Sequence, residues 1–372
     1  MVKAYGRPLL VSNETPDLCP WFSRWEIVSQ CQGQHYSLPG GSIGRRYVDI
    51  LTDEVSHLAS GNYPSERLIV FSSLILQHDR TVKKGCDIRR VLERRLGLWQ
   101  EEKFDVLLQE TVRCDKALKN RRKVNDDDHV VKVFSRLMLQ GRIRAALRWI
   151  TERSNSGVMD PNDVIELKSG DGSFVKKTVS EVLASKHPEP CPPHSLSLLT
   201  DDLPLFENVE VTGALIHKVV FGVQGGAGPG GCDANHWRDA LLRYGSHSSR
   251  LRDAVAYLSR TIANNFVPWS SIKALLSNGL IALNKNPGVR PIGIGETLRR
   301  IVGKAVCWMT RGDAEVSCGV DQLCAGVKIG IEAAFHAVND LFDSDSGEDW
   351  GLLTIDASNA FNSINRIALL WN

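Results

Sequence analysis

The chain has 372 residues, 42% hydrophobic and 24% charged, which is the composition of an ordinary globular protein with room for two domains. No stretch approaches the roughly 18–20 uninterrupted apolar residues of a membrane span, and the N-terminus lacks the apolar run of a signal peptide. We therefore expect an intracellular protein, nuclear or cytoplasmic, without a membrane partner. A net charge of +2 neither supports nor excludes binding to nucleic acid.

Residues 1–65 are rich in Gly, Pro, Ser and aromatic residues and have no sustained periodicity, so we predict an irregular leader. Cys31 and His35 have a spacing that suggests a metal knuckle, as do Cys191 and His194. Structural zinc sites combine two such pairs at a regular separation, and neither pair has a partner pair. We expect buried or loop cysteines at these positions.

Residues 66–153 have helical periodicity and are predicted to form a helical domain. Between 86 and 100, apolar residues recur at three- and four-residue steps, and Asp87 is placed as an N-cap. Segments 101–118 and 126–153 repeat the pattern. Basic residues cluster around the first two helices: Arg89, Arg90, Arg94, Arg95, Lys119, Arg121, Arg122 and Lys123. They form either a solvated helix face or a stripe that follows a nucleic-acid backbone.

Residues 154–210 are dense in turn residues, with one short helix near 178–186, and are predicted to be a linker. Further along, residues 223–231 carry five glycines and a proline before an amphipathic helix. This loop fits neither the P-loop nor the dinucleotide-binding pattern.

Two apolar runs, Leu280–Leu283 and Val289–Ile292, flank a strong turn signal at 286–288 and predict a β-hairpin. A helix follows, with Arg299, Arg300 and Lys304 spaced to share one face. A further helix is predicted after residue 330, with apolar residues at helical spacing.

A short apolar run at Leu352–Ile355 predicts a buried strand that ends in Asp356, with a helix that begins near Asn359 or Phe361. A carboxylate at the end of a core strand is well placed to hold a hard divalent cation. Taken alone, Asp356 could equally be the N-cap of the following helix.

In this order, the four segments resemble the reverse transcriptases (RNA-directed DNA polymerases) of non-LTR, LINE-like retroelements. The resemblance covers about 150 residues and rests on the sequence around Asp356 and Phe361, the Arg-Pro-Ile hairpin strand, the Gly-Pro-Gly-Gly loop at 228–231 and the helix after 330. The loop departs from the family pattern, because Gly230 stands where Asp is usual.

The resemblance implies a nucleotide site and a metal site. Asp356, with the backbone carbonyl of Ala357, would hold Mg²⁺ in two-metal phosphoryl transfer. Phe361 would lie under the sugar of the incoming nucleotide and favour dNTPs over ribonucleotides. Lys285 and Arg290 would contact the triphosphate, which needs cations that approach from the side opposite the metals.

Arg299, Arg300 and Lys304 would contact phosphates of an RNA template or a DNA primer, or form a solvated face. The fold class expected is α+β: a mainly helical N-terminal region, then fingers and the first part of a right-hand polymerase palm over residues 211–372.

The 372 residues contain no aromatic-x-Asp-Asp sequence, the second carboxylate motif of these enzymes. We therefore expect this polypeptide alone to be inactive, and its half-built palm sheet to expose the Leu352–Ile355 strand. One alternative is a domesticated or relic protein whose helical N-terminal half binds RNA. Another is an RNA-dependent RNA polymerase, which Phe361 argues against because its ring leaves no room for a 2′-hydroxyl.

Overall fold

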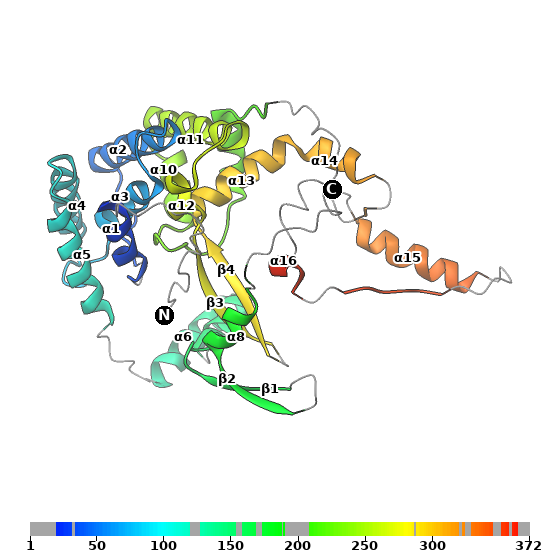
Figure 1. The fold of residues 1–372 in the computed structure, drawn as a ribbon. Helices are drawn as coiled ribbons and strands as arrows, with labels where there is room; N and C mark the ends of the chain where they lie inside the picture. Colours follow the sequence, from blue (N-terminus) through cyan, green and yellow to red (C-terminus); the bar gives the residue numbers. More distant parts are fainter. Residues whose placement is uncertain are drawn as a thin grey trace.

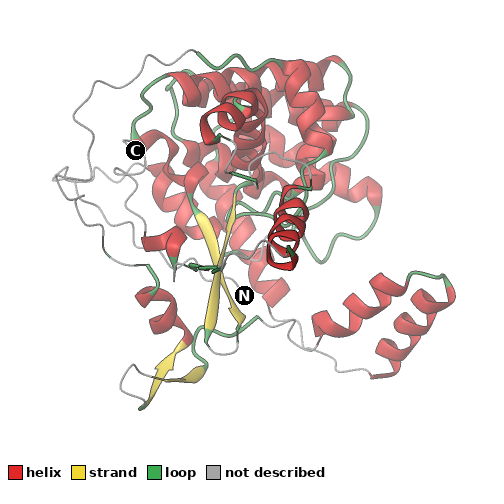
Figure 2. Cartoon of the chain, turned by 90° about the vertical axis from the view of Figure 1, so that its right-hand side faces the viewer, coloured by secondary structure: helices red, strands yellow, loops and turns green. Residues whose placement is uncertain are grey.

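The computed structural model describes residues 20–31, 34–119, 127–153, 158–168, 173–187, 189, 208–285, 288–319, 322–323, 329–344, 351–356 and 359–363. These ranges are mostly helical, and their strands form two separate antiparallel pairs (Figures 1 and 2), which agrees with the expected α+β class. None of the described helices is long and apolar enough to cross a membrane.

The N-terminal half contains seven helices within the described ranges: α1 (Pro20–Ser29), α2 (Ser42–Ala59), α3 (Ser65–Leu76), α4 (Gly85–Gln100), α5 (Phe104–Lys119), α6 (Asp127–Leu139) and α7 (Ile143–Arg153). The predicted helices at 86–100 and 101–118 are confirmed as α4 and α5. Asp87 lies in the first turn of α4 rather than at its N-cap, which is Lys84. The predicted helix over 126–153 is two helices, because Gly141 adopts a left-handed φ of 69° between α6 and α7.

The prediction of an irregular leader over residues 1–65 is wrong for α1 and α2; residues 1–19 lie outside the described residues. In α2, Tyr47, Val48, Leu51, Val55 and Leu58 recur at helical spacing and are all buried. The aromatic residues of α1 show no helical periodicity in the sequence. They pack against residues that are distant in the chain. The ring of Trp21, for example, lies edge-on to that of Phe104, 4.8 Å away.

One hydrophobic core joins both halves of the chain, so the predicted helical domain at 66–153 is not a separate packing unit. Beyond residue 208 the helical elements are α9 (Gly213–Phe221), α10 (Ala234–Leu242), α11 (Ser246–Asn264), α12 (Trp269–Leu276) and α13 (Thr297–Met309). The core runs from Val28 to Ala305; α2 packs along α11, and α3 packs against α1 and α12. Figure 1 shows these blue and yellow-green helices side by side. Periodicity predicts that a helix has a buried face but not which helix covers it.

The predicted linker at 154–210 contains its own structure: β1 (Val164–Lys168), β2 (Phe174–Thr178) and α8 (Val179–Ser185). Thr178 and Glu181 form a capping box at the start of α8, which confirms the short helix predicted there. Val179, Val182 and Leu183 are buried against one face of the next hairpin. The segment is therefore a second, small packing unit.

The predicted β-hairpin is confirmed as β3 (Asn278–Asn284) and β4 (Val289–Gly295), paired from Asn278–Gly295 to Asn284–Val289. Residues 286–287 of its turn lie outside the described residues. Ala282 and Val289 face the second packing unit and are 3% and 2% exposed. Alternation along the strands puts Arg290 on the opposite face.

Towards the C-terminus lie α14 (Arg311–Cys318), α15 (Gly330–Asp343) and α16 (Ala360–Ser363). The helix predicted after residue 330 is confirmed as α15, although Ile331 and Phe335 are exposed. The predicted buried strand at Leu352–Ile355 is not formed. Residues 351–356 pair with no described strand, and Leu353 and Ile355 are 82% and 85% exposed. The apolar side chains of this segment are exposed, but they lie in an extended segment and not at the edge of a sheet.

Candidate nucleotide and nucleic-acid site

Two residues predicted to bind a nucleotide, Lys285 and Arg290, lie near the turn of the β3–β4 hairpin. The backbone N–H of Lys285 donates to the carbonyl of Gly288 at 3.0 Å and closes the turn. Arg290 lies across from Leu283 on the face opposite the buried Val289. Both cationic side chains are exposed, and neither has an ion-pair partner among the described residues. Their charge is therefore available to an anionic ligand.

Each of the three cations of α13 has a structural partner: Arg299 contacts the junction of α12 and β3, whereas Arg300 and Lys304 contact the loop after α9. Arg299 donates to the carbonyl of Leu276 at 2.9 Å, and Lys304 donates to the carbonyl of Gly222 at 2.9 Å. Arg300 donates to the carbonyls of Gln224 and Gly226. These acceptors are neutral, so the side chains fasten α13 to its surroundings while their positive charge remains. A phosphate contact stays a prediction for all three.

The glycine-rich loop, defined here as residues 222–231, packs against the junction of β4 and α13. Gly231 N–H donates to the carbonyl of Gly228 at 3.0 Å and closes the Gly-Pro-Gly-Gly turn. A Cβ on Gly228 would lie 2.7 Å from the backbone nitrogen of Glu296. Arg238 of α10 donates to the carbonyl of Val223 at 2.8 Å. The loop is therefore a packing element whose carbonyls are used within the protein.

Glu296, which the sequence reasoning missed, is the buried carboxyl of this region. It separates β4 from α13, is 4% exposed, and accepts a hydrogen bond from Gly230 N–H at 2.6 Å. Burial raises the pKa of Glu296 to about 7, against the opposite influence of the Gly230 N–H and the Arg300 guanidinium. Its position directly before a helix whose first turn carries Arg299 and Arg300 is the signal that could have identified it.

Asp356 is exposed at the end of an extended segment. Ala357 lies outside the described residues, and so does the side chain of Phe361, whose backbone is part of α16. Asn359 donates through its side-chain amide to the carbonyl of Lys186 at 2.8 Å, which links this region to the end of α8. Because α8 packs on β4, the Asp356 segment and the hairpin share a neighbour.

The described residues contain no group of three or more His, Cys, Asp or Glu side chains that could hold a metal ion. A single exposed carboxylate does not fit two divalent cations, so Asp356 without further ligands is not a Mg²⁺ site. His35 is half-buried beside Cys232, with its Nδ1 3.7 Å from the sulfur, and desolvation lowers the pKa of His35 to about 3. Cys191 and His194 lie outside the described residues.

Some of the basic residues of α4 and α5 have acidic partners within the described part of the chain. Arg94 and Arg95 both bind Glu110, and Arg90 lies 3.6 Å from Asp87. Positions 121–123 lie outside the described residues. Glu110 carries one negative charge for the two arginines, and exposed Arg89 has no ion-pair partner among the described residues, so a nucleic-acid stripe on α4 stays a prediction.

The helices α6 and α7 differ from α4 and α5 in this respect. Four cations are exposed in this region: Lys132 and Arg136 of α6, Arg142 in the turn between the helices, and Arg144 of α7. No ion-pair partner for these four lies among the described residues. Exposed cations without counter-charges are what a phosphate backbone requires.

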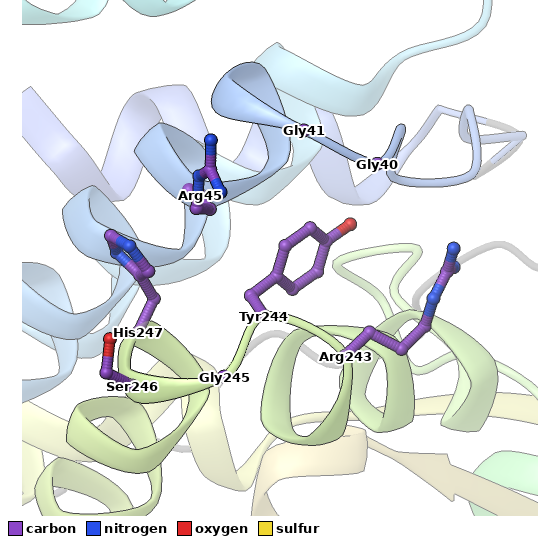
Figure 3. A pocket seen from close by; sticks show the side chains of 8 residues that line it. All are labelled: Gly40, Gly41, Arg45, Arg243, Tyr244, Gly245, Ser246 and His247. Atoms are coloured by element: carbon purple, nitrogen blue, oxygen red, sulfur yellow. The ribbon is translucent and has the colours of Figure 1, made fainter.

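A cavity of about 390 Å³ lies away from all these residues, between the start of α2 and the turn that joins α10 to α11 (Figure 3). Its lining includes Arg45, Arg243 and His247. Arg243 pairs with Asp239 at 2.6 Å and His247 with Asp49 at 2.7 Å, so much of the positive charge is compensated. No residue predicted from the sequence as a site residue lines it.

Comparison with protein-family models, with curated proteins and with solved structures finds no match to this chain.

Proposed function

We propose that residues 211–372 are the fingers and the beginning of the palm of a reverse transcriptase. The observation that carries the proposal is the β3–β4 hairpin, which has one face buried and exposes Lys285 and Arg290 near its turn. A hairpin of this kind, followed directly by a basic helix, suits an incoming nucleoside triphosphate and a phosphate backbone beside it.

In this proposal Lys285 and Arg290 bind the triphosphate, and the cations of α13 contact the phosphates of an RNA template or a DNA primer. Asp356 and the carbonyl of Ala357 contribute to a Mg²⁺ site that needs additional carboxylates. Phe361 excludes the 2′-hydroxyl. Residues 1–372 alone then bind dNTPs without extending a primer.

The test is titration of the 372-residue chain with a fluorescent dNTP. Replacing Lys285 or Arg290 with Ala removes a charged hydrogen bond of about 1.5–3 kcal/mol, so each should weaken binding roughly 10- to 100-fold. Lys176→Ala, at an exposed cation of β2 that pairs with Glu166, is the control and should leave Kd unchanged. Unchanged affinity in the Lys285 and Arg290 variants contradicts the proposal. Primer extension that Asp356→Ala abolishes would refute the expected inactivity.

A second candidate function, RNA binding by the N-terminal half, is favoured by the four exposed cations of α6, α7 and the turn between them, which have no ion-pair partner among the described residues. Deleting residues 220–372 cannot test it, because Leu251, Val255 and Ile301 belong to the core that the two halves share. Replacing Lys132, Arg136, Arg142 and Arg144 with Gln in the full chain is the suitable perturbation. For single-stranded RNA, it should reduce the slope of log K against log salt by up to about 2.8, or 0.7 for each lost phosphate contact. An unchanged slope rejects this candidate.

A further inference from the structure

The helices α6 and α7 form an antiparallel hairpin that stands apart from the helical core (Figure 2). Gly141 has its left-handed φ in the turn between them, and its N–H donates to the carbonyl of Met138 at 2.9 Å. Within the described part of the chain, each helix packs against the other and against no further element to a comparable extent. The sides of the hairpin that lie away from the helix–helix contact are therefore uncovered.

The exposed apolar side chains of this hairpin share one feature of position. Each comes one residue after a side chain that is buried or partly buried between the two helices. In α6, Val131 follows Val130 and Met138 follows Leu137; in α7, Leu147 follows Ala146 and Ile150 follows Trp149. Ala146 is fully buried, which fixes the inward side of α7.

This spacing places the exposed apolar residues of both helices on one side of the hairpin. One residue turns the side-chain direction by about 100° around a helix axis. Because the two helices run in opposite directions, the same turn carries the side chains of both to the same side. Ile143, four residues before Leu147, extends the row in α7. We define the apolar face as Val131, Met138, Ile143, Leu147 and Ile150, whose exposed fractions lie between 41% and 61%.

The cations of the two helices lie on the opposite side. Each comes one residue before a partly buried side chain: Lys132 before Val133, Arg136 before Leu137 and Arg144 before Ala145. The turn away from the helix–helix contact is then in the other sense. Two apolar faces can therefore meet without bringing these cations together.

The charges at the two ends of the hairpin suit a second copy of this chain. The turn carries Arg142, whereas α6 begins at the open end with Asp127 and Asp128. A two-fold axis that lies in the interface and crosses the helices puts the turn of one copy beside the open end of the other. Opposite charges then meet at both ends of the pair.

The size of the apolar face agrees with a weak but specific pair. The longer helix, α6, has 13 residues. With a rise of about 1.5 Å per residue and a width of about 10 Å per helix, the face measures roughly 20 Å by 20 Å, and two such faces bury roughly 1,000 Å². An anionic membrane is a poorer occupant, because the cations would lie about 10 Å farther from it, a distance over which salt screens their attraction.

We propose that the apolar face of the α6–α7 hairpin pairs with the same face of a second copy of this chain to form a four-helix bundle. Each copy contributes two helices, and the apolar faces become the core of the bundle. The basic sides remain outward. The proposal rests on neither the nucleotide site nor RNA binding, so either of those can fail without affecting it.

Sedimentation equilibrium of the full chain between about 1 and 100 µM tests the pairing, since an interface of this size should associate in roughly the micromolar range. We expect the mass to rise with concentration from 41.2 kDa towards twice that value. Val131→Glu and Leu147→Glu each place two carboxylates in the bundle core, one from each copy, so the dissociation constant should rise at least roughly 10-fold. Both side chains are more than half exposed in the single chain, so both variants should have the far-UV circular dichroism of the wild type.

Val316→Glu is the matched control. It makes the same substitution at a valine of α14 that is 83% exposed, and it should leave the dissociation constant unchanged. A monomer at every concentration overturns the proposal, and so does a pair whose dissociation constant is the same in all three variants. If the chain stays monomeric and its apolar face binds vesicles of phosphatidylserine and phosphatidylcholine, with binding lost in Leu147→Glu, the occupant is a membrane and the pairing is rejected.

Discussion

Replacing Arg95 with Met should be among the most damaging single changes in the helical core. Arg95 is 1% exposed although it carries a charge. Its guanidinium donates to Glu110 at 2.9 Å and to the carbonyls of Ile75 and Gln77 at 3.0 and 2.6 Å, at the end of α3. Met preserves most of the buried aliphatic volume, so the variant isolates the loss of these hydrogen bonds and of the charge.

Removing one partner of a buried ion pair typically costs about 3–5 kcal/mol. Arg94 still binds Glu110 at 2.7 Å in the variant, so the carboxylate is not left alone. We therefore expect a loss of about 3–4 kcal/mol in the free energy of unfolding at pH 7, measured by urea titration. Arg90→Met is the control: its side chain is 81% exposed, and the loss should stay below about 1 kcal/mol.

The pH dependence provides a further check. Burial would raise the pKa of Glu110, but hydrogen bonds and charge from Arg94 and Arg95 outweigh it and lower the pKa. Because the pKa of Glu110 is lowered in the folded state, the ionised carboxylate stabilises the fold above its unfolded pKa, and this stabilisation is lost as pH falls. The difference in the free energy of unfolding between the wild type and Arg95→Met should therefore become smaller in acid. If Arg95→Met is no less stable than Arg90→Met at pH 7, the structural assignment of Arg95 is refuted.

Three other changes test separate features by urea unfolding. Gly230→Ala should lower the free energy of unfolding by about 1–3 kcal/mol, because the added Cβ would overlap Ile69. Gly226 has open space around it, so Gly226→Ala should be about as stable as the wild type. Equal effects of the two substitutions would contradict the close packing of the loop. Asp233→Ala removes the N-cap of α10 and should cost about 1 kcal/mol, a difference that disappears as pH falls through the lowered pKa of this carboxyl. Leu353→Lys should change the free energy of unfolding by less than about 0.5 kcal/mol, since the side chain is 82% exposed, and a large loss would show that the residue is buried in solution.

Helices and strands whose pattern of apolar residues lies within one short segment were predictable from the sequence. The helix α4 repeats Leu92, Leu96 and Trp99 on one face, and the β3–β4 hairpin has apolar runs on both sides of a Pro-Gly turn. Strand alternation puts Arg290 on the face opposite the buried Val289, and a contact of Lys285 or Arg290 with a triphosphate stays a prediction.

Partners across the chain were not predictable in this way. The apolar stripe of α2 is as regular as that of α4, yet the Gly-Pro-rich residues before it concealed it, and its cover comes from α11, about 200 residues later. The arginines of α4 read as a possible phosphate stripe because their counter-charge, Glu110, lies on a different helix. A run of cations in one helix says little about free charge until its neighbours are known.

Position 230 shows how contacts with distant parts of the chain determine which residue type fits at one position. From the sequence alone, Asp was expected at this position and glycine looked like a weakening of the motif. In this fold, a Cβ there would collide with Ile69, and a second carboxylate would lie beside that of Glu296. Because Glu296 already supplies a carboxyl to the loop, an Asp at position 230 would add charge repulsion to steric overlap. Glycine is therefore the residue that the packing at position 230 requires.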